Sequence, residues 1–232
     1  MNALVVGGAR GFGKALTDGL SSRGYDVITA SRSKHGCASY YSCDVGDLDS
    51  WRKTLKKIRA ENGCLDFLAC STGFAAAKRF RDLTSCDWNQ AFAKNVTYAA
   101  LALQELTDLL RASNNPRALT IGSQWSYETG CDELVPYAVA KHALRTLTED
   151  FAERNPSIKI NHYCPPSMDT ASYWKVRKSF QRIEKGCVIR GFNSGVLADP
   201  EIIAVAIISH AVKTRDSGRT FTIRPDGSVR VR

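Results

Sequence analysis

Residues 3–13 read ALVVGGARGFG, and this stretch decides the fold. Its apolar half predicts a short buried strand, which is followed at once by Gly7, Gly11 and Gly13. Apolar residues at helical spacing then predict a helix over residues 11–22. Glycines between a strand and a helix N-terminus let a pyrophosphate approach free N–H groups and the positive end of the helix dipole. The segment therefore predicts a dinucleotide-binding unit.

The rest of the chain continues the alternation of strands and helices. Strands are expected at residues 27–30, 39–42, 65–70, 118–122, 159–164 and 220–223. Helices are expected around residues 51–59, 88–110, 136–155 and 202–210. This order predicts an α/β fold, a single Rossmann-type doubly wound domain over residues 1–232 with a parallel sheet. Residues 165–198 are the one long irregular stretch, which is typical of a substrate-binding lid.

Composition excludes several classes of protein. Hydrophobic residues make up 44% of the chain, which argues against intrinsic disorder. The longest apolar run, residues 202–208, is too short to cross a membrane, and no basic segment precedes the first apolar run as in a secretory signal. The eight cysteines form no C-x-x-C pair, which favours free thiols in a reducing cytosol. We therefore expect a cytoplasmic protein without a metal site and without a membrane partner.

The positive charge is unevenly distributed. The net charge is +9, and residues 173–232 hold 12 Lys or Arg against 5 Asp or Glu. Such a surplus occurs in proteins that bind nucleic acid or anionic ligands, and it also occurs as plain solvated surface. The chain lacks the combined aromatic and basic motif of a known nucleic-acid reader, so no nucleic-acid partner is expected.

The second expected strand ends in Ala30-Ser31-Arg32, with no acidic residue. Dinucleotide sites that prefer NAD place an acid near the adenosine ribose, whereas NADP sites place an arginine there. Arg10, inside the glycine loop, adds a second guanidinium group that suits a 2′-phosphate. The sequence therefore favours NADPH/NADP+ over NADH, although either arginine could be plain surface.

Tyr137 and Lys141 stand four residues apart on an expected helix, so they share one face. A nearby ammonium favours phenolate and lowers a tyrosine pKa, and such a tyrosine can exchange a proton with a carbonyl or alcohol. The alternative is a core tyrosine beside a surface lysine.

Together these motifs resemble those of the short-chain dehydrogenase/reductase family, over nearly the whole chain. The matching positions are the glycine loop at residues 6–13, Asp44-Val45, Asn95-Val96, Ile121-Gly122-Ser123, Tyr137 with Lys141, Ile160-Asn161, Pro165-Pro166 and Thr170. The resemblance implies a seven-stranded sheet of order 3-2-1-4-5-6-7. It also implies a homodimer or homotetramer assembled through the helices that contain Asn95 and Tyr137.

The resemblance implies four catalytic roles. Tyr137 would be the general acid for reduction, and Lys141 would lower its pKa and hold the nicotinamide ribose. Ser123 would polarise the substrate carbonyl, and it, rather than Ser126, occupies the family's serine position. Asn95 would hold a water that links Lys141 to solvent.

The resemblance also implies a set of cofactor contacts. They are Gly7, Arg10, Gly11, Phe12, Gly13, Ser31, Arg32, Asp44, Val45, Ser71, Gly73, Tyr137, Lys141, Pro165 and Thr170. Two departures from the family pattern bear on this set. Cys70-Ser71-Thr72-Gly73 replaces N-N-A-G, so local sheet hydrogen bonds must be made differently, and Pro166 replaces a glycine and stiffens its turn.

The expected lid is aromatic and basic. Its residues 173–198 include Tyr173, Trp174, Phe180 and Phe192 together with Lys175, Arg177, Lys178, Arg182, Lys185 and Arg190, with Glu184 as the acidic residue. Trp125 and Tyr127 follow Ser123 and are expected to border the pocket. The substrate side is accordingly assigned to Ser123, Trp125, Tyr173, Trp174 and Arg177. One hypothesis is an aromatic substrate with a carboxylate, phosphate or carrier-linked group, and the alternative is a solvated amphipathic lid.

The preferred interpretation is an NADPH-dependent carbonyl reductase acting on a small-molecule ketone or aldehyde. Two alternatives stay open. The same Tyr137 and Lys141 could serve a family member that acts on an imine or by elimination or isomerisation. The chain could also be a non-catalytic dinucleotide sensor, although sensing has no need of a tuned tyrosine.

Overall fold

A twisted sheet forms the centre of the computed structural model, which describes residues 1–34, 39–130, 133–183 and 197–232. In these residues eight strands lie in the order β3-β2-β1-β4-β5-β6-β7-β8. Their bounds are β1 (Asn2–Val6), β2 (Asp26–Ser31), β3 (Ser39–Ser42), β4 (Phe67–Cys70), β5 (Arg117–Ile121), β6 (Lys159–Cys164), β7 (Thr220–Ile223) and β8 (Val229–Val231). Strands β1 to β7 pair in parallel, as predicted.

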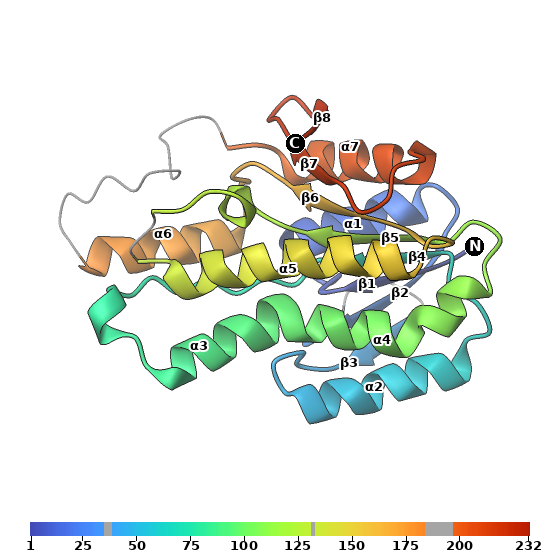
Figure 1. Ribbon diagram of the computed structural model, residues 1–232, viewed down its shortest axis with the longest axis horizontal. Helices are drawn as coiled ribbons and strands as arrows, with labels where there is room; N and C mark the ends of the chain where they lie inside the picture. Colours follow the sequence, from blue (N-terminus) through green and yellow to red (C-terminus); the bar gives the residue numbers. More distant parts are fainter. Residues whose placement is uncertain (35–38, 131–132, 184–196) are drawn as a thin grey trace.

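Helices cover both faces of the sheet (Figure 1). They are α1 (Gly11–Ser21), α2 (Leu48–Glu61), α3 (Ser85–Phe92), α4 (Tyr98–Arg111), α5 (Val135–Arg154), α6 (Ala171–Ile183) and α7 (Pro200–Lys213). Helices α1 and α7 pack on one face, and α2, α4 and α5 pack on the other. Because both faces are covered, all four residues of β4 are buried, which explains its continuous apolar sequence.

Helix α2 illustrates how the sequence pattern places a helix. Trp51, Leu55 and Ile58 recur at helical spacing and are fully buried, while the basic residues between them face solvent. The indole N–H of Trp51 donates to the backbone oxygen of Tyr98 at 2.9 Å. This bond ties α2 to α4 and satisfies a polar group that burial would otherwise leave unpaired.

Three local features differ from the sequence prediction. The sheet gains the antiparallel strand β8, because Asp226 and Gly227 form a turn in which Gly227 has φ +83° and its N–H bonds to the oxygen of Arg224. The single long helix expected over residues 88–110 is divided into α3 and α4 by a π-helical turn, η2 (Ala93–Thr97). The stretch expected to be irregular contains helix α6.

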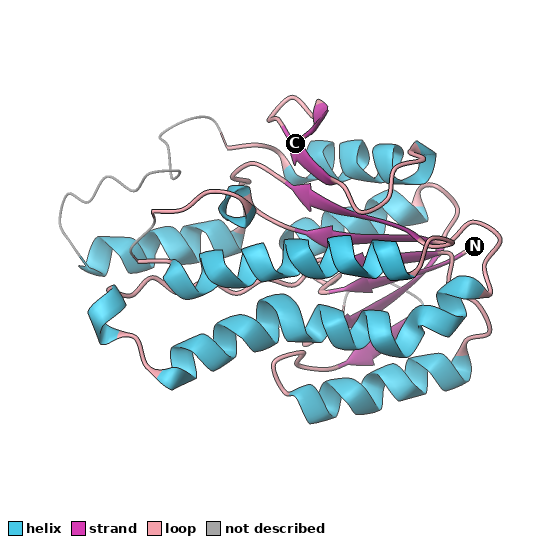
Figure 2. Cartoon of the chain, viewed as in Figure 1, coloured by secondary structure: helices cyan, strands magenta, loops and turns pink. Residues whose placement is uncertain are grey.

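The carboxyl ends of the parallel strands meet at one edge of the sheet. Figure 2 shows the arrowheads of the central strands directed toward the end of the molecule where α6 lies. The loops after β1, β4, β5 and β6 therefore gather there, and they carry most of the predicted site residues. No helix in the described ranges has both the length and the apolar character needed to span a membrane.

Candidate active site

The glycine loop after β1 has the backbone shape that a bound pyrophosphate needs. Gly7 and Gly11 have φ values of +86° and +53°, in the left-handed region that favours glycine. A Cβ on Gly13 would lie 2.1 Å from the backbone oxygen of Gly7, so no side chain fits there. The first turn of α1 carries no side-chain cap, and its N–H groups are left for an anion.

An unpaired polar atom marks the same cradle. The hydroxyl oxygen of Thr72 is buried and has no hydrogen-bond partner in the described part of the chain. It would lie 2.8 Å from a Cβ on Gly7, so it faces the glycine loop. Gly11 also approaches Thr170, whose Cβ would lie 3.7 Å from a Cβ on Gly11. The loop therefore fits the phosphates of a dinucleotide.

The predicted adenosine side combines exposed arginines with residues that are buried or held by hydrogen bonds. Arg10 and Arg32 are exposed, and neither makes an ion pair within the described residues. The hydroxyl of Ser31 donates to the oxygen of Ser33 at 2.8 Å. Asp44 is held in its turn, because its carboxylate accepts from the N–H of Gly46 at 2.9 Å. Beside it Val45 is buried, and Phe12 is likewise buried behind the glycine loop.

Ser71 makes hydrogen bonds between β4 and β1 at the position where the family pattern has asparagine. Its hydroxyl and its N–H both donate to the backbone oxygen of Val6, at 2.7 and 3.1 Å. The buried hydroxyl of Tyr98 donates to the oxygen of Thr72 at 3.0 Å. Side-chain hydroxyls therefore link β1, β4 and α4 at the point where amide side chains stand in the family pattern.

Asn95 lies in the π-helical turn and is fully buried. Its side-chain oxygen accepts from the N–H of Phe74 at 3.1 Å, and its side-chain nitrogen donates to the oxygens of Phe74 and Ala91, each at 2.8 Å. These bonds fix the backbone that follows Gly73. A π turn inside a helix often marks a functional site, and here it directs Asn95 toward the carboxyl edge of the sheet.

Lys141 projects from α5 into the same region and is 2% exposed. Its ammonium donates to the backbone oxygen of Ile121 at 2.7 Å. Burial lowers the pKa of Lys141 to about 8. A Cβ on Gly73 would lie 3.6 Å from the side-chain oxygen of Asn95 and 3.7 Å from the lysine nitrogen, so Gly73 separates the two groups without filling the space.

Tyr137 stands one helical turn before Lys141, as predicted, but its pKa is not the one expected. Burial raises the pKa of Tyr137 to about 12, and a hydrogen bond with Ser123 opposes that rise. The lysine nitrogen lies 5.7 Å from the centre of the tyrosine ring and donates a hydrogen bond to the backbone oxygen of Ile121. In the protein alone, desolvation therefore outweighs the ammonium, and the phenol stays protonated at neutral pH.

The loop after β5 presents Ser123 at the start of a short 3-10 turn, η3 (Gln124–Ser126). The N–H of Ser123 donates to the hydroxyl of Ser126 at 3.1 Å. Ser126 in turn lies 2.9 Å from the ring nitrogen Nε2 of His162, a fully buried residue of β6. The sequence prediction ranked Ser126 below Ser123 and missed His162. The available signal was a histidine in the middle of a predicted strand.

The predicted substrate residues divide into buried and exposed groups. Trp125 is 5% exposed because it packs with Leu134, Val176 and Phe180, and through the last two it contacts α6. Tyr173 is also buried. Lys185, Arg190, Phe192 and Glu184 lie outside the described residues.

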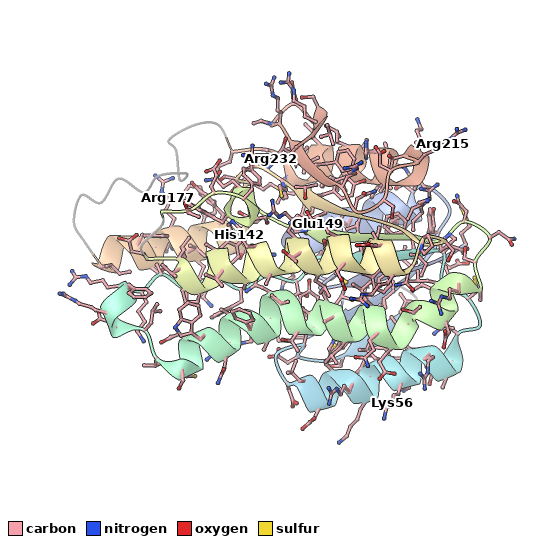
Figure 3. The ribbon with its side chains drawn as sticks, in the orientation of Figure 1. Lys56, His142, Glu149, Arg177, Arg215 and Arg232 are labelled. Carbon is pink, nitrogen blue, oxygen red and sulfur yellow. The ribbon has the colours of Figure 1, made fainter. Side chains whose placement is uncertain are left out.

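Trp174 remains 42% exposed on α6. Its indole N–H donates to Asp169 at 2.7 Å, and the guanidinium of Arg177 lies 5.3 Å from its ring. Figure 3 shows Arg177 at the α6 end of the molecule. Thr170 begins the helix by accepting from the N–H of Tyr173 at 3.3 Å, and Pro165 and Pro166 are half-buried before it.

Comparison with known proteins agrees with this fold. A family model described as short chain dehydrogenase matches residues 1–180. The chain is 24% identical over 218 residues to a 3-oxoacyl-[acyl-carrier-protein] reductase of Vibrio harveyi, covering 89% of this chain and 87% of the relative. It is 24% identical over 217 residues to an acetoacetyl-CoA reductase of Shinella zoogloeoides, covering 89% and 88%. The structure of the Pseudomonas aeruginosa RhlG/NADP complex has the same fold, with a TM-score of 0.83, 22% identity and coverage of 98% and 96%.

Proposed function

Because the chain belongs to the short-chain dehydrogenase family, we propose that it is an NADPH-dependent reductase of ketones or aldehydes. The observation that carries this proposal is the convergence of Tyr137, Ser123 and Lys141 at one edge of the sheet. Asn95 reaches the same place through the π-helical turn. Proton transfer to a carbonyl needs a positioned proton donor, and Tyr137 with Lys141 beside it can provide one.

The chain offers a complete set of groups for NADPH. Gly7, Gly11 and the start of α1 would hold the pyrophosphate, and Arg10 and Arg32 would hold the 2′-phosphate. The other residues that we expect to contact the dinucleotide are Phe12, Gly13, Ser31, Asp44, Val45, Ser71, Gly73, Pro165 and Thr170. When bound, NADPH supplies the hydride that reduces the carbonyl carbon.

Tyr137 supplies the proton in this reaction. A phenol with a pKa near 12 is fully protonated at neutral pH, so it is ready to donate to the carbonyl oxygen as negative charge develops there. Ser123 hydrogen-bonds the same oxygen and helps to orient it. Lys141, kept close by its bond to Ile121, stabilises the phenolate that remains, and Asn95 completes the route by which the proton is replaced.

The rim of the site supports one class of substrate. Exposed Trp174 and its partner Arg177 suit an apolar or aromatic group that carries an anion. By name, the two relatives described above are a reductase of 3-oxoacyl groups on an acyl carrier protein and a reductase of acetoacetyl-CoA. We propose a homo-oligomer that works in the cytoplasm, with carbonyl reduction favoured over imine reduction, elimination or isomerisation.

The test compares the purified protein with Tyr137→Phe. Titration calorimetry with NADPH and NADH should give tight binding of NADPH and weak binding of NADH to both proteins. Acetoacetyl-CoA, simple ketones and a cyclic imine are then supplied with NADPH. Turnover of a ketone should fall by a factor on the order of 10² or more in Tyr137→Phe. If neither dinucleotide binds, or if the variant keeps full turnover, the proposal is wrong.

A further inference from the structure

A line of hydrogen bonds runs beneath the active-site loop and uses none of the four catalytic side chains. It joins the hydroxyl groups of Thr148 on α5, Thr120 on β5 and Ser126 through the ring of His162, all of them fully buried. Thr120 lies 2.7 Å from both the Thr148 hydroxyl and the Nδ1 of His162. The Nε2 of His162 then lies 2.9 Å from the Ser126 hydroxyl.

The hydrogen bond that the Thr148 hydroxyl donates to the backbone oxygen of Leu144 sets the direction of this line. Thr148 donates its one hydroxyl proton to the oxygen of Leu144 at 2.8 Å, so it accepts from Thr120. Thr120 has then used its proton and must accept from the Nδ1–H of His162. The neutral ring consequently has a bare Nε2, which accepts the proton of Ser126.

The charge of the ring agrees with this count. Burial, followed by the positive charges of Lys141 and Arg145, holds the pKa of His162 well below its ordinary value of 6.5. The thiol of Cys164 completes the surroundings of the ring, and burial raises its pKa to about 11, so it too is neutral. A neutral imidazole with one donor and one acceptor is the form that the hydrogen bonds require.

The end of the line reaches the backbone of Ser123. Since the Ser126 proton goes to His162, a lone pair of the Ser126 hydroxyl is free to accept the N–H of Ser123 at 3.1 Å. The N–H of Ser126 donates back to the oxygen of Ser123 at 2.9 Å. These reciprocal bonds fix both sides of Ser123, and so fix the direction in which its side chain leaves the backbone.

The neighbouring glycine is shaped to the histidine. A Cβ on Gly122 would lie 2.2 Å from the Nε2 of His162, a distance that no real contact allows. The imidazole occupies the space that any side chain at position 122 would need. The loop, the glycine and the histidine therefore form one fitted unit.

Resting on the proposed reductase activity, we propose that His162 and Ser126 act as a positioning pair that holds Ser123 in its catalytic orientation. Neither residue touches the substrate in this proposal. His162 fixes the rotamer of Ser126 by accepting a hydrogen bond from its hydroxyl, and the Ser126 oxygen then accepts a hydrogen bond from the N–H of Ser123. Loss of either residue should leave substrate binding nearly unchanged and slow the chemical step.

The test uses His162→Leu, Ser126→Ala and His162→Gln, with acetoacetyl-CoA or ethyl acetoacetate as probe. The first two should lower kcat by about 10- to 100-fold, the scale of a small misplacement of a catalytic group, with KM and the NADPH Kd changed less than about 3-fold. His162→Gln keeps an acceptor for Ser126 and should recover part of the loss. The double variant His162→Leu/Ser126→Ala should be no slower than the worse single variant.

Asn161→Ala is the matched control. Asn161 precedes His162 on β6, is 2% exposed, and bonds to the backbone of Asp216 and Arg219 at 2.9 Å each. Its side chain points to the opposite face of the sheet, because side chains alternate along a strand. This variant should lower the melting temperature and leave kcat within about 3-fold of the wild type, which separates positioning from general destabilisation.

Three outcomes overturn the proposal: unchanged kcat in His162→Leu, additive losses in the double variant, or an equal loss of kcat in Asn161→Ala. Crystal structures of wild type and His162→Leu give a reading that does not depend on turnover. In the variant, the Ser123 side chain should turn away from Tyr137. If Ser123 keeps its position, the proposed positioning role of His162 and Ser126 is wrong. If the wild type reduces no probe, the proposed function fails, while these structures still decide the positioning role.

Discussion

Replacing Lys141 by methionine should stabilise the protein while it removes activity. Lys141 is 2% exposed, and within the described residues its ammonium has one hydrogen-bond acceptor, the oxygen of Ile121, and no carboxylate partner. Burial lowers its pKa from 10.5 to about 8. A charge held in this way costs folding free energy.

The size of the effect follows from the pKa change. Each pKa unit corresponds to about 1.4 kcal/mol, so the charged form costs about 3 kcal/mol below pH 8. Methionine fills a similar volume without a charge, but it leaves the Ile121 oxygen without its donor, which costs about 1–2 kcal/mol. The variant should therefore gain about 1–2 kcal/mol, or roughly 2–8 °C in melting temperature.

The pH dependence has a definite sign. In the unfolded chain Lys141 keeps its proton up to about pH 10.5, whereas in the folded chain it loses it near pH 8. Between these values the unfolded state binds more protons, so the stability of the wild type rises with pH. The advantage of Lys141→Met should be largest below pH 8. Toward pH 10.5 the stability difference should shift by about 3 kcal/mol in favour of the wild type, which then becomes the more stable of the two proteins.

Urea denaturation without cofactor, repeated from about pH 7 to about pH 10.5, measures this difference directly. Lys56→Met is the matched control for loss of a positive charge, because Lys56 is exposed on α2 and points away from the body of the protein (Figure 3). Its difference from the wild type should stay constant with pH. Parallel curves for wild type and Lys141→Met would refute the reasoning, since the lysine would then be as well solvated in the folded as in the unfolded chain.

Three further predictions test other parts of the site. Gly122→Ala should lower the free energy of unfolding by about 1–3 kcal/mol, because its Cβ would clash with the ring of His162. The same substitution should cost less in a His162→Val background, and an equal cost in both backgrounds by calorimetry would contradict this steric explanation. Arg32→Ala should weaken NADPH by about 10-fold or more and leave NADH unchanged in titrations, whereas equal losses would remove Arg32 from the phosphate site. Arg177→Ala/Lys178→Ala should reduce kcat/KM for an anionic ketone more than for its neutral analogue, and a preserved preference would show that the lid is only solvated surface.

The sequence alone determined the architecture. Periodic apolar residues defined the strands, and the glycines between β1 and α1 identified the dinucleotide fold, because both signals are local. Tyr137 and Lys141 shared a face for the same reason: a spacing of four residues fixes their relation on any helix. The seven parallel strands and their order, implied by the resemblance, are confirmed.

Only the tertiary structure decided the chemistry of the individual groups. The pKa values of Tyr137 and Lys141 depend on burial by distant segments, so the expected low tyrosine pKa was wrong for the protein alone. The hydrogen bonds from Thr148 to Ser126 cross α5, β5 and β6, which no local pattern brings together. Sequence spacing fixes neighbours along an element, whereas desolvation and cross-strand hydrogen bonds arise only when the elements pack.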